Sequence, residues 1–182
     1  MIQIIDVDPK NKAMRQQMAQ VLVDGFRHPA PDAWPTLEDG EEEVAECLEE
    51  GNICIAAVDE SETVVGWIGG QYEYGRVWEL HPLVVAPSQH KKGIGRTLVA
   101  ELEERVKAKE GLTLVLGTDD HIGQTSIYGL DLYPNVWEYV RDIENLHGHA
   151  FGFYQKVGFT IYGIIPDANG LGEHDIMMAK RL

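Results

Sequence analysis

A proline inside a predicted strand, followed by a glycine-containing loop and a helix, constrains the fold of this chain most strongly. Residues 77–85 have the composition of a strand, but Pro82 lies inside it. Proline cannot donate a backbone hydrogen bond to a neighbouring strand, so we expect a bulge or a splayed pairing at this point. The next element, at 93–109, is predicted as a helix, because apolar side chains recur every four residues from Ile94 to Val106.

The other predicted elements complete a mixed order of strands and helices. Strands are expected at residues 2–7, 53–58, 64–71, 112–116, 159–165 and 176–180. Helices are expected at 11–24, 41–50 and 150–157, with a helical piece within 137–146, and glycines at 25, 51, 111 and 158 are expected to end four helices. Residues 27–35 and 166–173 are predicted as loops. This order predicts an α+β fold (mixed α/β), with a central mixed sheet, helices on both faces and a single domain spanning 1–182.

The charge balance excludes some partners and leaves others open. The chain has 30 acidic residues against 15 lysines and arginines, a formal charge of −15. This excess argues against binding to nucleic acid or to anionic lipid. It is compatible with a cationic ligand, which a negative cleft would concentrate, and with a simpler role in solubility. The eight acids between Glu38 and Glu50 allow the same two interpretations, as a solvated helix face or as an acidic rim over a substrate site.

The two cysteines do not form a recognisable covalent or metal framework. Cys47 and Cys54 make no Cys-x-x-Cys pair, and no histidines stand near them at zinc spacing. We therefore interpret them as small buried apolar residues and expect no metal. The sequence has no signal peptide pattern and no run of about 18 apolar residues, so a cytoplasmic protein that does not enter the membrane is expected.

The loop that precedes the helix at 93–109 has the properties of an anion site. Helix N-termini present free N–H groups, and glycines at 93 and 95 leave room for a phosphate to approach the backbone. Lys91, Lys92 and Arg96 add positive charge. The loop lacks the Gly-Lys-Ser/Thr of a Walker motif, and Leu98 stands where a dinucleotide fingerprint would have its third glycine. The alternative is a helix that merely begins with flexible residues.

This segment resembles the acetyl-CoA signature of the GNAT acyltransferases. The resemblance rests on Leu83-Val84-Val85 and on Lys91-Lys92-Gly93-Ile94-Gly95, although His90 stands where the family usually has Gln or Arg. It implies a mostly antiparallel sheet, splayed at a bulged strand, with acetyl-CoA as cosubstrate. It also implies a set of cofactor-binding residues: Leu83, Val84, Val85, Lys91, Lys92, Gly93, Ile94, Gly95 and Arg96.

A second family segment lies near the C-terminus. Residues 153–159, Phe-Tyr-Gln-Lys-Val-Gly-Phe, resemble the Phe-Tyr-x-Lys-x-Gly-Phe segment of these enzymes. In the family this tyrosine lies near the thioester and can protonate the leaving thiolate. The resemblance therefore implies that Tyr154 binds the cofactor and acts as the acid. Without it, Tyr154 would be interpreted as a buried tyrosine with a satisfied hydroxyl.

The resemblance is closest to one branch, the aminoglycoside 6′-N-acetyltransferases of the enterococcal chromosomal type. The matching segments are residues 78–85, 116–120, 131–133, 145–146 and 166–170, while the first 50 residues match only loosely, most clearly at Trp34-Pro35. The branch implies a homodimer, an aminoglycoside acceptor and a cofactor contact at Asn145.

Acetylation of an amine requires specific chemical groups. An alkylamine is protonated near pH 7, so a base must remove a proton before the nitrogen attacks the thioester. With the resemblance, Glu79 is the candidate base, and His81 has the same side-chain parity on the strand unless Pro82 disturbs it. The N–H of Leu83 is the candidate donor to the oxyanion. The alternatives are an exposed strand carboxylate and a histidine satisfied beside a turn.

The acidic composition then has a possible function in acceptor binding. The predicted substrate-binding residues are Trp34, Tyr74, Glu79, Asp119, Asp120 and Asp131, with solvation as the alternative for the acids. Two other functions remain open. One is acetylation of a polyamine, a peptide N-terminus or a protein lysine, and the other is a non-catalytic module that binds acyl-CoA.

Overall fold

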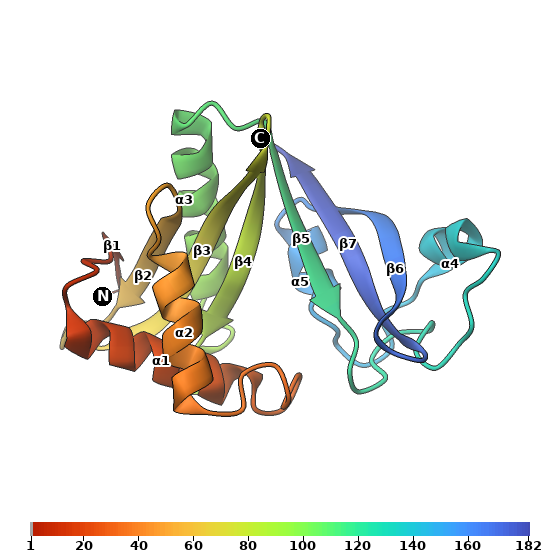
Figure 1. The fold of residues 1–182 in the computed structure, drawn as a ribbon, viewed down its shortest axis with the longest axis horizontal. Coiled ribbons are helices and arrows are strands. Elements are labelled where there is room, and N and C mark those ends of the chain that lie inside the picture. The colour runs from red at the N-terminus through yellow and green to blue at the C-terminus, as the bar shows by residue number, and fades with distance from the viewer. Residues whose placement is uncertain (1) are drawn as a thin grey trace. The chain divides into compact units, whose positions relative to one another are not determined.

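The computed structural model describes residues 2–182, which form two compact units. The first unit runs to Leu112 and includes Leu182, and the second comprises Thr113–Arg181. Figure 1 shows the elements of both. Each unit is described separately below, and the prediction of a single domain over 1–182 stays a prediction. Within residues 2–182, none of the helices combines the length and the apolar character that crossing a bilayer requires.

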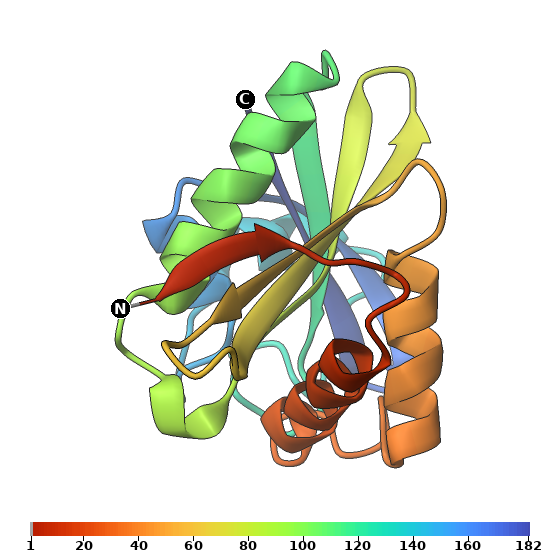
Figure 2. The same ribbon diagram turned by 90° about the vertical axis from the view of Figure 1, so that its left-hand side faces the viewer.

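The first unit is a four-stranded antiparallel sheet with helices on both faces. Its strands follow the order β1 (Gln3–Asp6), β2 (Ile53–Val58), β3 (Val64–Tyr74) and β4 (Val77–Val85). Its helices are α1 (Lys12–Phe26), α2 (Leu37–Cys47) and α3 (Ile94–Ala108), with a short 3-10 turn at Pro87–Gln89. Helices α1 and α2 lie side by side on one face (Figures 1 and 2). The prediction of helices on both faces of a sheet is confirmed for this unit, whose own strands are all antiparallel.

Two contacts show which face each helix covers. The indole Nε1 of the fully buried Trp67 donates to the carbonyl of Met18 in α1, at 3.0 Å. A Cβ on Gly70 would instead lie 2.6 Å from a methyl group of Leu102 in α3. Because odd and even residues of β3 point to opposite faces, α1 and α3 pack on opposite sides of the sheet.

The predicted bulge in β4 is present. Ile68 of β3 pairs with Leu83, and Gly70 pairs with Leu80, so β4 has one extra residue opposite Gly69. A Cβ on Gly69 would lie 2.1 Å from the carbonyl oxygen of His81, which explains the glycine at this position. The bulge lies at His81-Pro82, as the proline predicts.

The bulge also changes which face the side chains of β4 occupy. Glu79 pairs with Gln71, an odd residue of β3, and therefore lies on the face that carries α1 and α2. Leu83 pairs with Ile68, an even residue, and therefore lies on the face that carries α3. Simple alternation would have kept Glu79 and Leu83 on one face.

Two predicted helix ends are wrong in the first unit. Helix α1 does not end at Gly25 but continues through it to Phe26. Helix α2 spans Leu37–Cys47 rather than 41–50, because Thr36 and Asp39 form a capping box that starts the helix four residues earlier. Its acidic first turn also complements the helix dipole.

Helix α3 agrees with its predicted range but ends differently. Gly93, with φ of 86°, is the N-cap, and the last helical residue is Ala108. The left-handed residue after the helix is Glu110, with φ of 61°, rather than the predicted Gly111. Gly111 serves another purpose, since a Cβ there would lie 2.3 Å from a methyl group of Val106.

The second unit is a three-stranded antiparallel sheet with two short helices. Its strand order is β5 (Thr113–Asp119), β7 (Glu173–Arg181) and β6 (Thr160–Gly170). Helix α4 (Val136–Asp142) begins one residue before the predicted helical piece at 137–146 and covers its first part, and α5 (Phe151–Lys156) lies within the predicted helix at 150–157. The predicted loop at 166–173 is wrong in its extent, because β6 continues to Gly170 through an irregular register and only Leu171-Gly172 form the turn.

Candidate functional site

Glu79 and His81, the predicted base and its partner, come together on β4. Both are half-buried, and they lie two residues apart just before the bulge. Each charge affects the other, since His81 lowers the pKa of Glu79 and Glu79 raises the pKa of His81. Pro82 does not disturb the shared side-chain parity of Glu79 and His81. The register shift separates Leu83 from this pair and leaves Glu79 and His81 on one side of the sheet.

Glu43 of α2 joins this face, although the sequence analysis did not single it out. Its side chain is only 9% exposed. One carboxylate oxygen, Oε2, accepts a hydrogen bond of 3.1 Å from the indole Nε1 of Trp34. The other oxygen, Oε1, lies 3.5 Å from Nε2 of His81 and has no hydrogen-bond partner among residues 2–182.

Trp34, which donates to this carboxylate, also packs against two other rings. The ring of Trp34 packs edge-on against Phe26 at a centroid distance of 4.7 Å and lies 5.9 Å from the ring of His81. Trp34, a predicted substrate residue, is therefore brought together with the predicted catalytic histidine. Tyr74, its predicted companion, lies at the end of β3 and is 68% exposed.

The environment of Glu79 raises its affinity for a proton. Burial is the main cause that raises the pKa of Glu79 above its ordinary value. Nearby Glu73 and Glu43 raise this pKa further, and His81 partly offsets them. A carboxylate with a raised pKa is a stronger base than an exposed one, which is the tuning that general bases commonly show.

The loop before α3 presents unpaired backbone donors. No described side chain caps the helix at Gly93, and a Cβ there would meet open space. Lys91, Lys92 and Arg96 are exposed around it, whereas Ile94 is buried and anchors the helix start. Thr97 N–H is the first to bond within the helix, to the carbonyl of Gly93. This arrangement has the features of an anion site at a helix N-terminus.

His90 and Lys92 fix the shape of this loop. The ring Nε2 of His90 lies 2.8 Å from the carbonyl oxygen of Val85, so the nitrogen donates and the ring ties the loop to the end of β4. The Nζ of Lys92 donates to Gln89 at 2.9 Å. His90, the departure from the family motif, therefore has a structural contact of its own.

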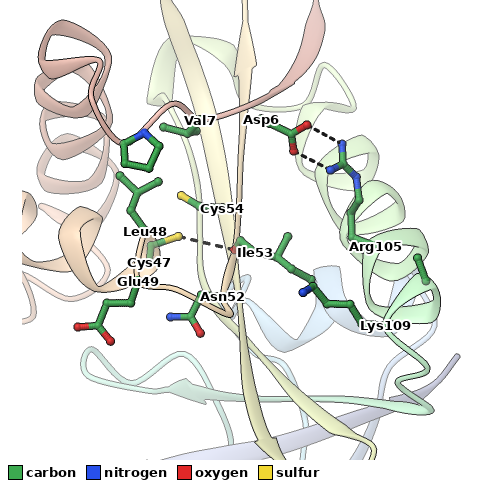
Figure 3. A pocket seen from close by; sticks show the side chains of 12 residues that line it. Asp6, Val7, Cys47, Leu48, Glu49, Asn52, Ile53, Cys54, Arg105 and Lys109 are labelled. Atoms are coloured by element: carbon green, nitrogen blue, oxygen red, sulfur yellow. Dashed lines mark hydrogen bonds and ion pairs between the residues drawn. The ribbon is translucent and has the colours of Figure 1, made fainter.

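A separate pocket of about 370 Å³ opens at the edge of β2, beyond the end of β1 (Figure 3). Cys47 and Cys54, both free thiols, line it together with Arg105, which forms an ion pair with Asp6. Contact with Cys54, together with burial, raises the pKa of the Cys47 thiol. None of the predicted site residues lines this pocket.

In the second unit, Tyr154 lies in α5 among aromatic rings. It is 9% exposed, and its ring centroid lies 5.2 Å from Phe153 and 5.7 Å from Phe159. Burial raises the pKa of the Tyr154 hydroxyl well above its ordinary value. The hydroxyl therefore stays protonated at neutral pH, as a proton donor must.

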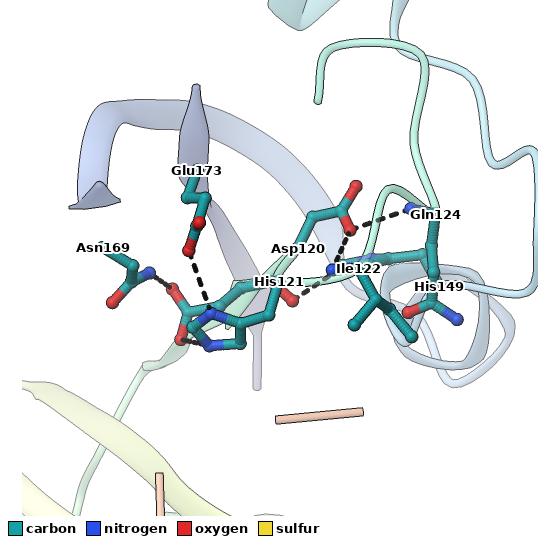
Figure 4. A network of polar contacts seen from close by, with 8 residues as sticks. Asp120, His121, Ile122, Gln124, His149, Asn169 and Glu173 are labelled. Atoms are coloured by element: carbon teal, nitrogen blue, oxygen red, sulfur yellow. Dashed lines mark hydrogen bonds and ion pairs between the residues drawn. The ribbon is translucent and has the colours of Figure 1, made fainter. Parts of the chain in front are cut away.

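Asp120 organises a loop instead of facing solvent (Figure 4). It is 2% exposed, and its carboxylate accepts hydrogen bonds from Gln124 N–H, Thr125 N–H and the Thr125 hydroxyl, each at 2.8 Å. Burial raises the pKa of Asp120, but these hydrogen bonds outweigh it and the net pKa is lowered. The geometry favours a structural role for Asp120 over the predicted contact with a substrate.

The other predicted residues of this unit differ in their exposure and in the number of hydrogen bonds that they make. Asp119 is exposed, accepts a hydrogen bond from Asn169 and lies 3.9 Å from the ring of His121. Asp131 is exposed and accepts one bond from Tyr133 N–H. The Asn145 amide makes three bonds, one to the His149 carbonyl and two from the N–H groups of Gly148 and His149. Asn145 therefore shapes the turn that leads into α5.

Comparisons with known proteins decide the family of this chain. The sequence pattern of the Acetyltransferase (GNAT) family matches residues 15–128. The chain belongs to the GNAT family of acetyltransferases. It is accordingly an acetyltransferase enzyme, and the GNAT fold, with seven mostly antiparallel strands flanked by helices, is confirmed.

Solved GNAT structures place the chain near one group of enzymes. An aminoglycoside 6′-N-acetyltransferase complexed with coenzyme A is 38% identical, with a TM-score of 0.89, and the alignment covers 98% of this chain and 96% of that one. The aminoglycoside 6′-N-acetyltransferase from Enterococcus faecium is 39% identical, with a TM-score of 0.86 and the same coverage. An aminoglycoside 6′-acetyltransferase type Ii is 34% identical, with a TM-score of 0.73 and again the same coverage. No curated protein sequence gives a match.

Proposed function

We propose that this GNAT enzyme transfers the acetyl group of acetyl-CoA to a primary amine of a polycationic small molecule, namely the 6′ amine of an aminoglycoside. The observation that carries the proposal is the 38% identity, over 98% of the chain, to an aminoglycoside 6′-N-acetyltransferase complexed with coenzyme A.

The loop before α3 fits the pyrophosphate of the cosubstrate. The uncapped helix start at Gly93 supplies N–H donors, and Lys91, Lys92 and Arg96 supply charge in an otherwise acidic chain. The glycine leaves space that a side chain would occupy. The part of β4 that follows the bulge, from Leu83 to Val85, would meet the pantetheine arm.

The proposed reaction divides the chemistry among three residues. Glu79 removes the proton from the acceptor's ammonium group, directly or through water, so that the nitrogen can attack the thioester carbonyl. The N–H of Leu83 donates to the oxygen that becomes negative as the C–N bond forms. Tyr154 donates its proton to the sulfur as the C–S bond breaks, and the products are the amide and coenzyme A.

The acceptor side is proposed to consist of aromatic and acidic groups. Trp34 packs beside His81 at the end of the cluster that contains Glu43. Asp119 and Asp131 are exposed carboxylates that can attract ammonium groups. The buried carboxylate of Asp120 instead accepts hydrogen bonds from the N–H groups of its own loop. The homodimer implied by the family resemblance stays a prediction, which light scattering of the purified protein would check.

A panel of acceptors tests the proposed function. The purified enzyme is mixed with acetyl-CoA and with kanamycin, tobramycin, spermidine or an N-terminal alanine peptide, and release of the coenzyme A thiol is measured. We expect release with the aminoglycosides, and mass spectrometry should show one added acetyl group. Activity on spermidine or the peptide alone would replace the acceptor, and coenzyme A binding without transfer to any amine would indicate a non-catalytic module.

A further inference from the structure

The Glu43 side chain is unusual for a surface helix of an acidic protein. Helix α2 buries Gly40, Glu43, Val44 and Cys47, which recur at the spacing of one helix face. Glu43 is therefore a carboxylate at a position that would normally be apolar. A buried charge is costly unless it is paired, so its partners should explain why it is there.

Those partners are Trp34 and His81. The indole bond of 3.1 Å satisfies only Oε2. The second oxygen, Oε1, has no hydrogen-bond partner in the described chain, and its nearest cationic candidate is Nε2 of His81 at 3.5 Å. A neutral ring would leave this buried oxygen opposite an uncharged group, whereas a protonated ring would compensate its charge.

We propose that Glu43 is a positioning residue, whose carboxylate, anchored by Trp34, holds His81 as an imidazolium beside Glu79. The role in catalysis rests on the proposed function, but the protonation state does not. The other charges with the largest effect on His81 are those of Glu46 from α2 and Glu79 from β4, and both are negative. Glu73, which faces Glu79, adds to this negative environment.

The protonation equilibrium of His81 agrees with this arrangement. Burial on its own lowers the pKa of His81, but contact with Glu43 and the charges of Glu43, Glu79 and Glu46 raise it above the ordinary value. The His81 side chain is 42% exposed, so water screens part of this effect. Among the charged side chains of residues 2–182 that raise this pKa, only Glu43 is in direct side-chain contact with His81.

The proposal separates the roles of the two candidate proton acceptors. An imidazolium has no free lone pair on nitrogen, so a protonated His81 cannot remove a proton from the acceptor amine. The base is then Glu79 alone. His81 contributes a positive charge that opposes the effect of burial on the pKa of Glu79 and keeps more of that carboxylate ionised.

The protonation of His81 can be measured directly by NMR. Long-range ¹H–¹⁵N spectra of the full-length, ¹⁵N-labelled enzyme, recorded from pH 5 to pH 9, report the state of each histidine ring, and His81→Gln assigns the His81 signals. We expect His81 to titrate above the ordinary value of about 6.5. Glu43→Gln keeps the size of the side chain and an acceptor for Trp34, and should lower the midpoint by about one pH unit.

Glu46→Gln is the matched control, because it removes an equal charge from the exposed side of the same helix. It should lower the His81 midpoint clearly less than Glu43→Gln does. Equal shifts in the two variants, or a wild-type midpoint at or below about 6.5, would overturn the proposal. The wild-type result decides even if Glu43→Gln does not fold, and Glu43→Asp should retain most of the elevation. No substrate is needed, so the outcome is independent of the acceptor panel.

Discussion

Gly25 in the last turn of α1 lies directly against Val84 of β4. A Cβ built on Gly25 would come within 2.4 Å of Cγ2 of Val84, which is closer than two carbon atoms can approach. Val84 follows Leu83, the proposed oxyanion donor, in the segment that would meet the pantetheine arm. The missing side chain of Gly25 therefore allows helix and strand to pack closely at the proposed site.

Gly25→Ala should destabilise the protein although it improves helix propensity. Alanine in a helix gains up to about 1 kcal/mol over glycine, whereas overpacking costs about 1–3 kcal/mol, so a net loss of about 1 kcal/mol is expected. Urea unfolding measures it. Gly163→Ala is the control, because a Cβ there comes no closer than 4.0 Å to Met177. A more stable Gly25→Ala variant would contradict the close packing.

Glu79→Gln should lower turnover far more at neutral than at alkaline pH. Removing a general base costs about 10²-fold or more, but free amine becomes abundant as the pH approaches the pKa of the acceptor. Because burial raises the pKa of Glu79, wild-type activity should fall on acidification at a higher pH than for an exposed carboxylate. Initial rates between pH 5.5 and 9.5 test both statements. Unchanged turnover of the variant at pH 7 would remove Glu79 from the mechanism.

Asp120→Ala should lower the free energy of unfolding by about 2–4 kcal/mol at pH 7, because buried N–H groups lose their acceptor. The folded-state pKa of Asp120 is lowered, so its stabilisation is complete above about pH 4 and is lost as the pH falls through the folded-state pKa. The difference between wild type and variant should therefore shrink in acid. Asp131→Ala, at an exposed aspartate with one hydrogen bond, should cost less than about 1 kcal/mol. Equal losses in denaturant titrations would argue against the loop role.

Gly93→Ala should weaken coenzyme A binding roughly tenfold, which corresponds to about 1.4 kcal/mol. Alanine is strained at the φ of 86° that Gly93 adopts, so the loop should shift and misplace its N–H groups. Gly51→Ala is a matched control, since Gly51 has a φ of 102° and also faces open space. Titration calorimetry should show normal affinity for the control. Equal affinities in both variants would mean that the loop does not hold the cosubstrate.

Local sequence patterns predicted most of the helices and strands, because the interactions that favour each element lie mostly between residues close in the sequence. The β2–β3 hairpin and α3 follow from alternating or fourfold apolar spacing, and the bulge follows from the missing N–H of Pro82. Thr36 and Asp39, at capping-box spacing, also mark the start of α2 in the sequence, four residues before the predicted start at 41. The prediction that Gly25 ends α1 was wrong, because this glycine allows a close tertiary contact with Val84.

The candidate site could be predicted only in part, because contacts between segments far apart in the sequence decide which side chains meet. Glu79, His81 and Trp34 were predicted, and their proximity to one another depends on the packing of α2 against the sheet. Glu43 could have been found as the one acid on an otherwise apolar face of its helix. Asp120 could not have been distinguished from Asp119, because only the folded loop shows which carboxylate accepts the backbone N–H groups.

The extra residue in β4 makes the length of this strand as important as its composition. Between Glu79 and Val84, β4 has one residue more than the segment of β3 that pairs with it. Only this extra residue brings the two side chains to the same face of the sheet. Deleting Pro82 would restore strict alternation and turn either Glu79 or Val84 to the opposite side of the sheet. Such a frame change would conserve every proposed functional side chain and still abolish the arrangement, so indels in this strand should be tolerated far less than substitutions.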